Sequence, residues 1–213
     1  MARRLGILFL ACCWHTLAGA AEVTREQQPY TVLGTTAEAL RSSMDRLGPL
    51  DPRTQQHRDS LTRWTLAWRY DTQDQFGRCD LTRVWTQVQI TQIQPRLGQP
   101  ETLAPALRRD WERFAAALSR HDEAMAAIAL QAAAEIDQAL PRLNRKECKD
   151  LRLEAEATAR NIVATARQRE AALDLQTDRG RSAGARFPWQ EGDPDNLTDR
   201  ERAKLKDRLP VTP

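Results

Sequence analysis

Residues 107–136 read LRRDWERFAAALSRHDEAMAAIALQAAAEI, and this stretch decides the fold. Its apolar side chains recur in steps of three and four residues, which is the spacing of one face of an α-helix. The positions on that face are Leu107, Trp111, Phe114, Leu118, His121, Met125, Ile128, Ala132 and Ile136. The spacing predicts one long helix with a continuous buried stripe, and we expect Pro141 to end it.

A second long helix is predicted after Pro141. Asn144 and Glu147 stand three residues apart, as in a capping box, and a further apolar stripe follows them. The stripe consists of Cys148, Leu151, Ala155, Ile162, Ala166 and Leu173. Because the two stretches contain many alanines, we expect the helices to pack closely as a helical hairpin.

The first half of the chain predicts strands. Residues 63–70 alternate between apolar and polar side chains, residues 82–90 alternate again, and the polar residues 71–77 form a turn between them. The inward positions are Trp64, Leu66, Trp68, Tyr70, Val84, Val88 and Ile90. Residues 30–33 are a further short strand, and residues 37–47 a helix that Gly48 and Pro49 close. We therefore predict an α+β fold, with a small antiparallel β-sheet packed against two long helices.

The two ends of the chain are predicted to lie outside this fold. Residues 1–20 have the charged, apolar and small-residue regions of a signal peptide, with cleavage near Ala20–Ala21. Acylation of Cys12 in a lipoprotein is the less favoured alternative, and no segment is long enough to span a membrane. We expect one domain at residues 21–189, a polar tail with a short helix at 190–213, and a periplasmic or secreted location. The sequence at Asn196 also matches a short glycosylation pattern.

Charge and cysteine content agree with export. Removal of Arg3 and Arg4 lowers the formal net charge from +3 to +1, and no clustered basic face suggests a nucleic-acid partner. Cys79 and Cys148 are the cysteines that remain, and two cysteines in an oxidising compartment usually form a disulfide. Such a bridge would stabilise the fold by roughly 4 kcal/mol. Two free buried thiols are the less favoured alternative, and zinc ligation is disfavoured because no CxxC pair is present.

The motif at residues 120–125, RHDEAM, suggests an altered metal site. In the HExxH motif, two histidines one helical turn apart bind zinc, and the glutamate between them activates the metal-bound water. Here His121 stands at the first histidine, Asp122 at the glutamate and Met125 at the second histidine. His121 and Met125 lie on the buried stripe, and Asp122 is expected at its edge.

The chain resembles a family of secreted bacterial proteins predicted to be zinc-dependent proteases. The resemblance rests on Tyr30 to Gly34, Trp64 to Tyr70, Cys79, Trp111, Phe114, Ile128, Ala129, Cys148, Asp174, Thr177, Gly180, Gly184, Ala185 and Pro188. It implies a zincin-like motif helix and a third metal ligand at the position of Arg179. Leu173 replaces the family's tyrosine, so His121 is the single retained residue of the four expected to run a zinc site.

Catalysis is not expected to carry over with this resemblance. Catalytic zinc needs three protein ligands and an open water position, whereas methionine is a poorly matched thioether and arginine cannot lose its proton. Asp122, Glu123 and Asp174 could take part in a rebuilt site, together with His57 from a polar loop.

Each of these residues also has a structural interpretation. We expect His121 to be a hydrogen-bonded core histidine, Met125 a core residue, and Asp122 and Glu123 surface charges of the helix. Arg179 is either solvated, or its guanidinium replaces the zinc charge beside Asp122 or Glu123.

The preferred functional prediction is a non-catalytic exported homologue that binds a protein or peptide and needs no cofactor. The first alternative is an active metallopeptidase with zinc in a rebuilt site. The second is a structural or assembly scaffold made of the helical pair. Zinc content distinguishes the first alternative from the others, and a groove beside His121 would favour binding over scaffolding.

Overall fold

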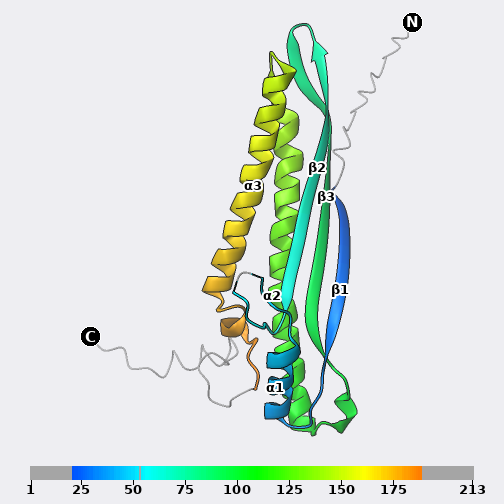
Figure 1. Ribbon diagram of the computed structural model, residues 1–213, viewed down its shortest axis with the longest axis vertical. Coiled ribbons are helices and arrows are strands. Elements are labelled where there is room, and N and C mark those ends of the chain that lie inside the picture. Colours follow the sequence, from blue (N-terminus) through cyan, green and yellow to red (C-terminus); the bar gives the residue numbers. More distant parts are fainter. Residues whose placement is uncertain (1–20, 53, 189–213) are drawn as a thin grey trace, which may run out of the picture.

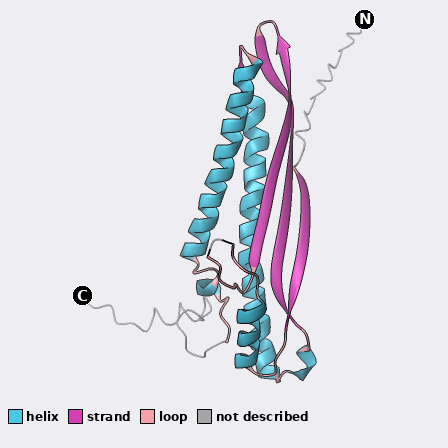
Figure 2. Ribbon diagram, viewed as in Figure 1, coloured by secondary structure: helices cyan, strands magenta, loops and turns pink. Residues whose placement is uncertain are grey.

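The computed structural model describes residues 21–52 and 54–188, arranged as an elongated molecule of two layers (Figure 1). A β-sheet forms one layer, and a hairpin of two long helices covers one of its faces (Figure 2). The strands are β1 Glu22–Val32, β2 Leu61–Gln75, β3 Arg78–Leu97 and β4 Asn144–Arg145. The helices are α1 Ala37–Leu47, α2 Pro105–Ala139 and α3 Cys148–Gln176, with short 3-10 turns at Pro100–Thr102, Leu140–Arg142 and Arg181–Ala183. The predicted α+β class is confirmed.

The sheet is mixed, whereas the sequence predicted a purely antiparallel one. The predicted antiparallel pair is present as β2 and β3, with Trp64 opposite Ile90. β1 pairs with β3 in parallel, from Glu22 opposite Gln87 to Val32 opposite Leu97. The strand order is β1-β3-β2 because α1 and the loop after it carry the chain past one strand position, which β3 then fills.

The strands are longer than predicted. β2 and β3 continue through most of the polar stretch that was expected to be a turn, and the turn itself is reduced to Phe76 and Gly77. Both turn residues have positive φ angles, 53° and 75°, which glycine adopts readily. The hairpin tip has no buried face, so no apolar alternation marks these strand residues in the sequence.

The helical hairpin forms as predicted, and its stripes are buried against the sheet. Alanines on both helices let the backbones approach closely and pack with Trp64, Val88 and Ile90. The predicted capping box is wrong. Glu147 is the N-cap residue of α3 without a side-chain cap hydrogen bond, while Asn144 pairs with Asp80 in the β3–β4 ladder.

The predicted disulfide is present. Cys79 at the start of β3 and Cys148 at the start of α3 have their Cα atoms 5.1 Å apart. Cys79 is fully buried among Leu81, Leu140 and Leu151. The bridge therefore fastens the sheet to the helical hairpin at one end of the molecule (Figure 1).

At the opposite end, a second core joins α1, α2 and the segment after α3. Phe187 contacts both Trp111 and Phe114, with ring centroids 5.5 Å apart in each pair. Leu40 and Met44 of α1 belong to the same buried cluster. This packing holds residues 177–187 against the N-terminal half of α2, where the candidate functional site lies.

Some predictions fall on residues outside the described ranges. They are the signal peptide, the tail helix and the glycosylation pattern at Asn196. Among the described helices, none combines the length and apolar character that a membrane span requires.

Candidate functional site

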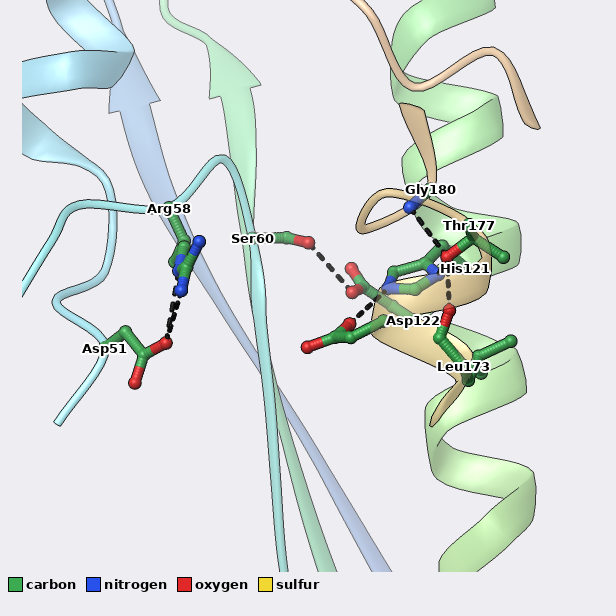
Figure 3. A network of polar contacts seen from close by, with 9 residues as sticks. Asp51, Arg58, Ser60, His121, Asp122, Leu173, Thr177 and Gly180 are labelled. Carbon is green, nitrogen blue, oxygen red and sulfur yellow. Dashed lines mark hydrogen bonds and ion pairs between the residues drawn. The ribbon is translucent and has the colours of Figure 1, made fainter. Parts of the chain in front are cut away.

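A cleft of about 410 Å³ lies where the α1–β2 loop, the middle of α2 and the end of α3 meet. Its lining is mainly polar and includes His121, the residue singled out by the sequence motif. Around it stand Asp51, His57, Arg58, Ser60, Asp122, Met125, Asp174, Arg179 and Arg181. Figure 3 shows how part of this network converges from the loop, the motif helix and the segment that follows α3.

His121 joins α2 to the end of α3. Its Nε2 atom lies 3.2 Å from Oδ1 of Asp174, and its Nδ1 atom lies 3.5 Å from Oγ1 of Thr177 (Figure 3). The side chain is only 8% exposed. The prediction of a hydrogen-bonded, largely buried histidine is confirmed.

The turn after α3 is shaped to cover this histidine. The Thr177 hydroxyl donates to the Leu173 carbonyl at 2.7 Å and accepts the Gly180 N–H at 3.0 Å. Asp178, Arg179 and Gly180 all have positive φ angles, so the chain reverses sharply. A Cβ atom on Gly180 would come within 3.0 Å of the His121 Cβ, and only glycine allows this approach without displacement.

Asp122 is buried, contrary to the prediction of a surface charge. It is 2% exposed, and it accepts hydrogen bonds from Ser60 Oγ at 2.8 Å and Gln94 Nε2 at 2.7 Å. Burial raises the pKa of this carboxyl above its ordinary value, and the hydrogen bonds from Gln94 and Ser60 oppose that rise. Neither Ser60 nor Gln94 was predicted as a site residue, because isolated polar residues near strand ends carry no periodic signal in the sequence.

Glu123 is a surface residue, as predicted, and lies outside the cleft lining. Arg25 Nη1 donates to one carboxylate oxygen at 2.8 Å and Gln92 Nε2 to the other at 3.1 Å. These hydrogen bonds, with that from Arg25 the stronger, lower the pKa of Glu123. Glu123 therefore ties α2 to β1 and β3, and it is separate from the other motif residues.

Met125 and His57 occupy the kinds of position predicted for them. Met125 is 8% exposed and belongs to the buried stripe of α2, while it also touches the cleft. His57 lies on the exposed loop before β2, and its Nδ1 atom is 2.6 Å from the Gly48 carbonyl oxygen. His57 lines the same cleft as His121, but the two side chains come from different elements, the α1–β2 loop and α2.

Arg179 lines the cleft as an exposed side chain. No hydrogen bond or ion pair within the described ranges joins its guanidinium to Asp122 or Glu123, so the predicted replacement of zinc by this cation is not formed. Ser60 and Gln94 bind Asp122 instead, and Arg25 of β1 and Gln92 of β3 bind Glu123.

The residues at the implied zinc positions do not fit a catalytic zinc ion. His121 is engaged by Asp174 and Thr177, Met125 offers a thioether, and Arg179 offers no lone pair. Across residues 21–52 and 54–188, no three side chains among His, Cys, Asp and Glu are grouped so as to hold a metal ion. Catalytic zinc requires three such ligands in addition to a water position.

The chain belongs to a family of bacterial proteins of unknown function, DUF922, whose model matches residues 27–180. The matched region runs from within β1 to Gly180, so it contains the second half of β1, the strands β2 to β4, the helices α1, α2 and α3, and the residues around His121. No curated protein and no solved structure matches the chain.

Proposed function

We propose that this chain is an exported, non-catalytic member of its family that binds a peptide or protein segment in the cleft beside His121. One observation carries the proposal: the hydrogen-bonded contact of His121 with Asp174. The residue that the resemblance would make a zinc ligand serves instead to hold the segment after α3 against the motif helix. On this proposal, the resemblance to proteases reflects a fold inherited from a common ancestor and not a shared activity.

The surroundings of Asp122 support loss of hydrolysis. This carboxylate stands where the water-activating glutamate of an HExxH motif would stand, yet both of its oxygens accept hydrogen bonds from Ser60 and Gln94. A general base must also reach the water that it activates, and Asp122 is only 2% exposed. Asp122 is therefore better suited to joining α2 to the ends of β2 and β3.

The cleft supports binding over a purely scaffolding role. Its volume of about 410 Å³ lies within the range of ligand sites, and its walls combine charged groups with Leu118 and Phe187. Export is supported by the leader-like residues 1–20 and by the Cys79–Cys148 disulfide, because such bridges persist in oxidising compartments. The partner that we propose is an unidentified protein or peptide.

The zinc content of the purified, oxidised mature protein tests the proposed loss of catalysis. The protein is incubated with zinc, freed of excess metal and submitted to elemental analysis. We expect far less than one zinc per chain in a folded sample. A content near one per chain, lost in a His121→Ala variant, would overturn the proposal and favour an active metallopeptidase with a rebuilt site.

Binding in the cleft is tested separately with an array of short peptides. His57→Trp narrows the cleft from its exposed loop, and Thr54→Trp adds the same bulk to that loop outside the cleft lining. We expect the first variant to lose peptides that the parent and the second variant retain. Equal binding by both variants would place the binding surface elsewhere.

A further inference from the structure

The charged side chains that line the cleft differ in whether they already form hydrogen bonds or ion pairs with other residues of the protein. Six carboxylates and four arginines line it. Every one of the carboxylates accepts a hydrogen bond or ion pair from within the described structure. The pairs are Asp45 and Asp59 with Arg41, Asp51 with Arg58, Glu170 with Arg167 and Trp64, Asp122 with Ser60 and Gln94, and Asp174 with His121.

Two of the four arginines remain available. Arg179 makes no side-chain hydrogen bond or ion pair within residues 21–52 and 54–188. Arg181 has a single ion-pair contact, to Asp178 at 3.7 Å, and its side chain is 60% exposed. An exposed pair at this distance contributes little and is easily exchanged for another partner. The available guanidinium groups among the described lining residues therefore both lie on the turn after α3.

From this contrast we infer that the cleft recognises a carboxylate of its ligand through Arg179 and Arg181, an inference that rests on the proposed peptide-binding function. A guanidinium binds a carboxylate with two parallel hydrogen bonds, a geometry that a point charge cannot reproduce. Four of the six lining carboxylates are paired with Arg41, Arg58 or Arg167, and these cations offset much of the repulsion that an anionic ligand would meet.

The turn that carries the two arginines is preorganised. Arg179 N–H donates to the Asp174 carbonyl at 2.8 Å, and Ser182 N–H donates to the Thr177 carbonyl at 3.0 Å. Ala185 N–H donates to the Gly180 carbonyl at 3.0 Å, which adds a third hydrogen bond within the same segment. A backbone that is fixed before binding lowers the entropy lost when a ligand is captured.

Two peptide groups share the carboxylate chemistry: a C-terminal carboxylate and the side chain of aspartate or glutamate. Four fluorescent six-residue peptides separate them, with one central glutamate or glutamine and with a free or amidated C-terminus. Their affinities for the mature, oxidised protein are measured by fluorescence anisotropy at low salt. Dependence on the central residue assigns the side chain, and dependence on the C-terminus assigns the terminal carboxylate.

We expect at least one of the carboxylate-bearing peptides to bind about five times more tightly than the neutral peptide, or better. This difference in affinity should shrink as salt is added. The double variant Arg179→Gln/Arg181→Gln should abolish the preference, whereas Arg160→Gln should retain it. Arg160 is a matched control because it is an exposed arginine of α3 that lies outside the cleft lining. Like Arg181, it has one long ion pair, to Glu156 at 3.6 Å.

The contrary outcomes separate this inference from the proposed function. Equal binding of all four peptides, unchanged in the double variant, would overturn carboxylate recognition and leave peptide binding in place. Binding of none of them at millimolar concentration would overturn both. Arg179→Lys adds a geometric test: partial loss of the preference supports two parallel hydrogen bonds, and full retention contradicts them.

Discussion

The Nε2 atom of His121 lies 3.2 Å from the Oδ1 atom of Asp174, across 53 residues of sequence. This contact joins the middle of α2 to the last turn of α3, and Gly180 lies directly over the same imidazole. His121 is thus a contact point for the whole segment that forms one wall of the cleft. His121, which the family resemblance links to metal binding, therefore has structural contacts in this chain.

A double-mutant cycle measures how much this contact contributes to stability. His121→Gln and Asp174→Asn should each lower the free energy of unfolding by about 1 kcal/mol, because each removes one side of a partly buried polar pair. The coupling energy should be about 0.5–1.5 kcal/mol when urea unfolding of both single variants and the double variant is compared. Asp178→Asn, on an exposed side chain of the same turn, is the control and should have little effect. Zero coupling would mean that the contact does not hold the segment.

Asp122 gives the protein a pH dependence of known sign. Its pKa in the folded state is raised above 3.8, chiefly by burial, so the folded state holds the proton more tightly than the unfolded state. Stability contributed by this group therefore falls as pH rises from about 3.8 through the folded-state pKa. Asp122→Asn removes this titration.

Urea unfolding of the parent and the Asp122→Asn variant between pH 4 and 7 tests the sign. The stability of the variant relative to the parent should increase with pH over this range. Glu123→Gln is an informative comparison, because hydrogen bonds from Arg25 and Gln92 lower the pKa of Glu123. The stability of the Glu123→Gln variant relative to the parent should therefore fall as pH rises, in contrast to that of the Asp122→Asn variant. Parallel curves for the parent and the Asp122→Asn variant would show that the folded-state pKa is not raised.

The sequence predicted the parts of this fold that have a long periodic pattern. The stripe of α2 from Trp111 to Ile136, the inward face of β2 and the Cys79–Cys148 bridge are all present in the structure. β1 could not be recognised over its full length, since nearly all of its residues up to Gln28 are exposed. Its parallel pairing depends on where α1 returns the chain, and no local pattern encodes that.

The candidate site was predictable only in part. His121 and Met125 could be placed on the buried stripe from their spacing alone. Asp122 is next to that stripe, and whether such a position meets water or protein depends on how far the sheet extends over the helix. Here Ser60 and Gln94, from segments 62 and 28 residues away, supply the donors that make its burial tolerable. A hydrogen bond between two single polar residues that are this far apart in the chain cannot be recognised from one sequence.

Loss of the disulfide should affect stability more than the cleft. Cys79 and Cys148 are separated by 69 residues, and a loop of this length corresponds to roughly 4 kcal/mol in the loop-entropy model. The double variant Cys79→Ala/Cys148→Ala should lower the free energy of unfolding by about 3–4 kcal/mol. Because the bridge joins the starts of β3 and α3, whereas the cleft forms at the end of α3, peptide binding by the folded fraction should change little. Loss of binding in samples shown to be folded would contradict this separation.

A pair of glycine substitutions isolates the packing of the turn on His121. Gly180 and Gly77 both have positive φ angles, 84° and 75°, so replacement by alanine imposes a similar backbone cost of roughly 1–2 kcal/mol at each. An added Cβ meets nothing within 4 Å at Gly77, but at Gly180 it meets the His121 Cβ at 3.0 Å and Cγ at 3.1 Å. Gly180→Ala should therefore lower the free energy of unfolding by about 1–3 kcal/mol more than Gly77→Ala, because the turn must move away from α2. Urea unfolding measures both, and equal losses would mean that the turn does not rest on the imidazole.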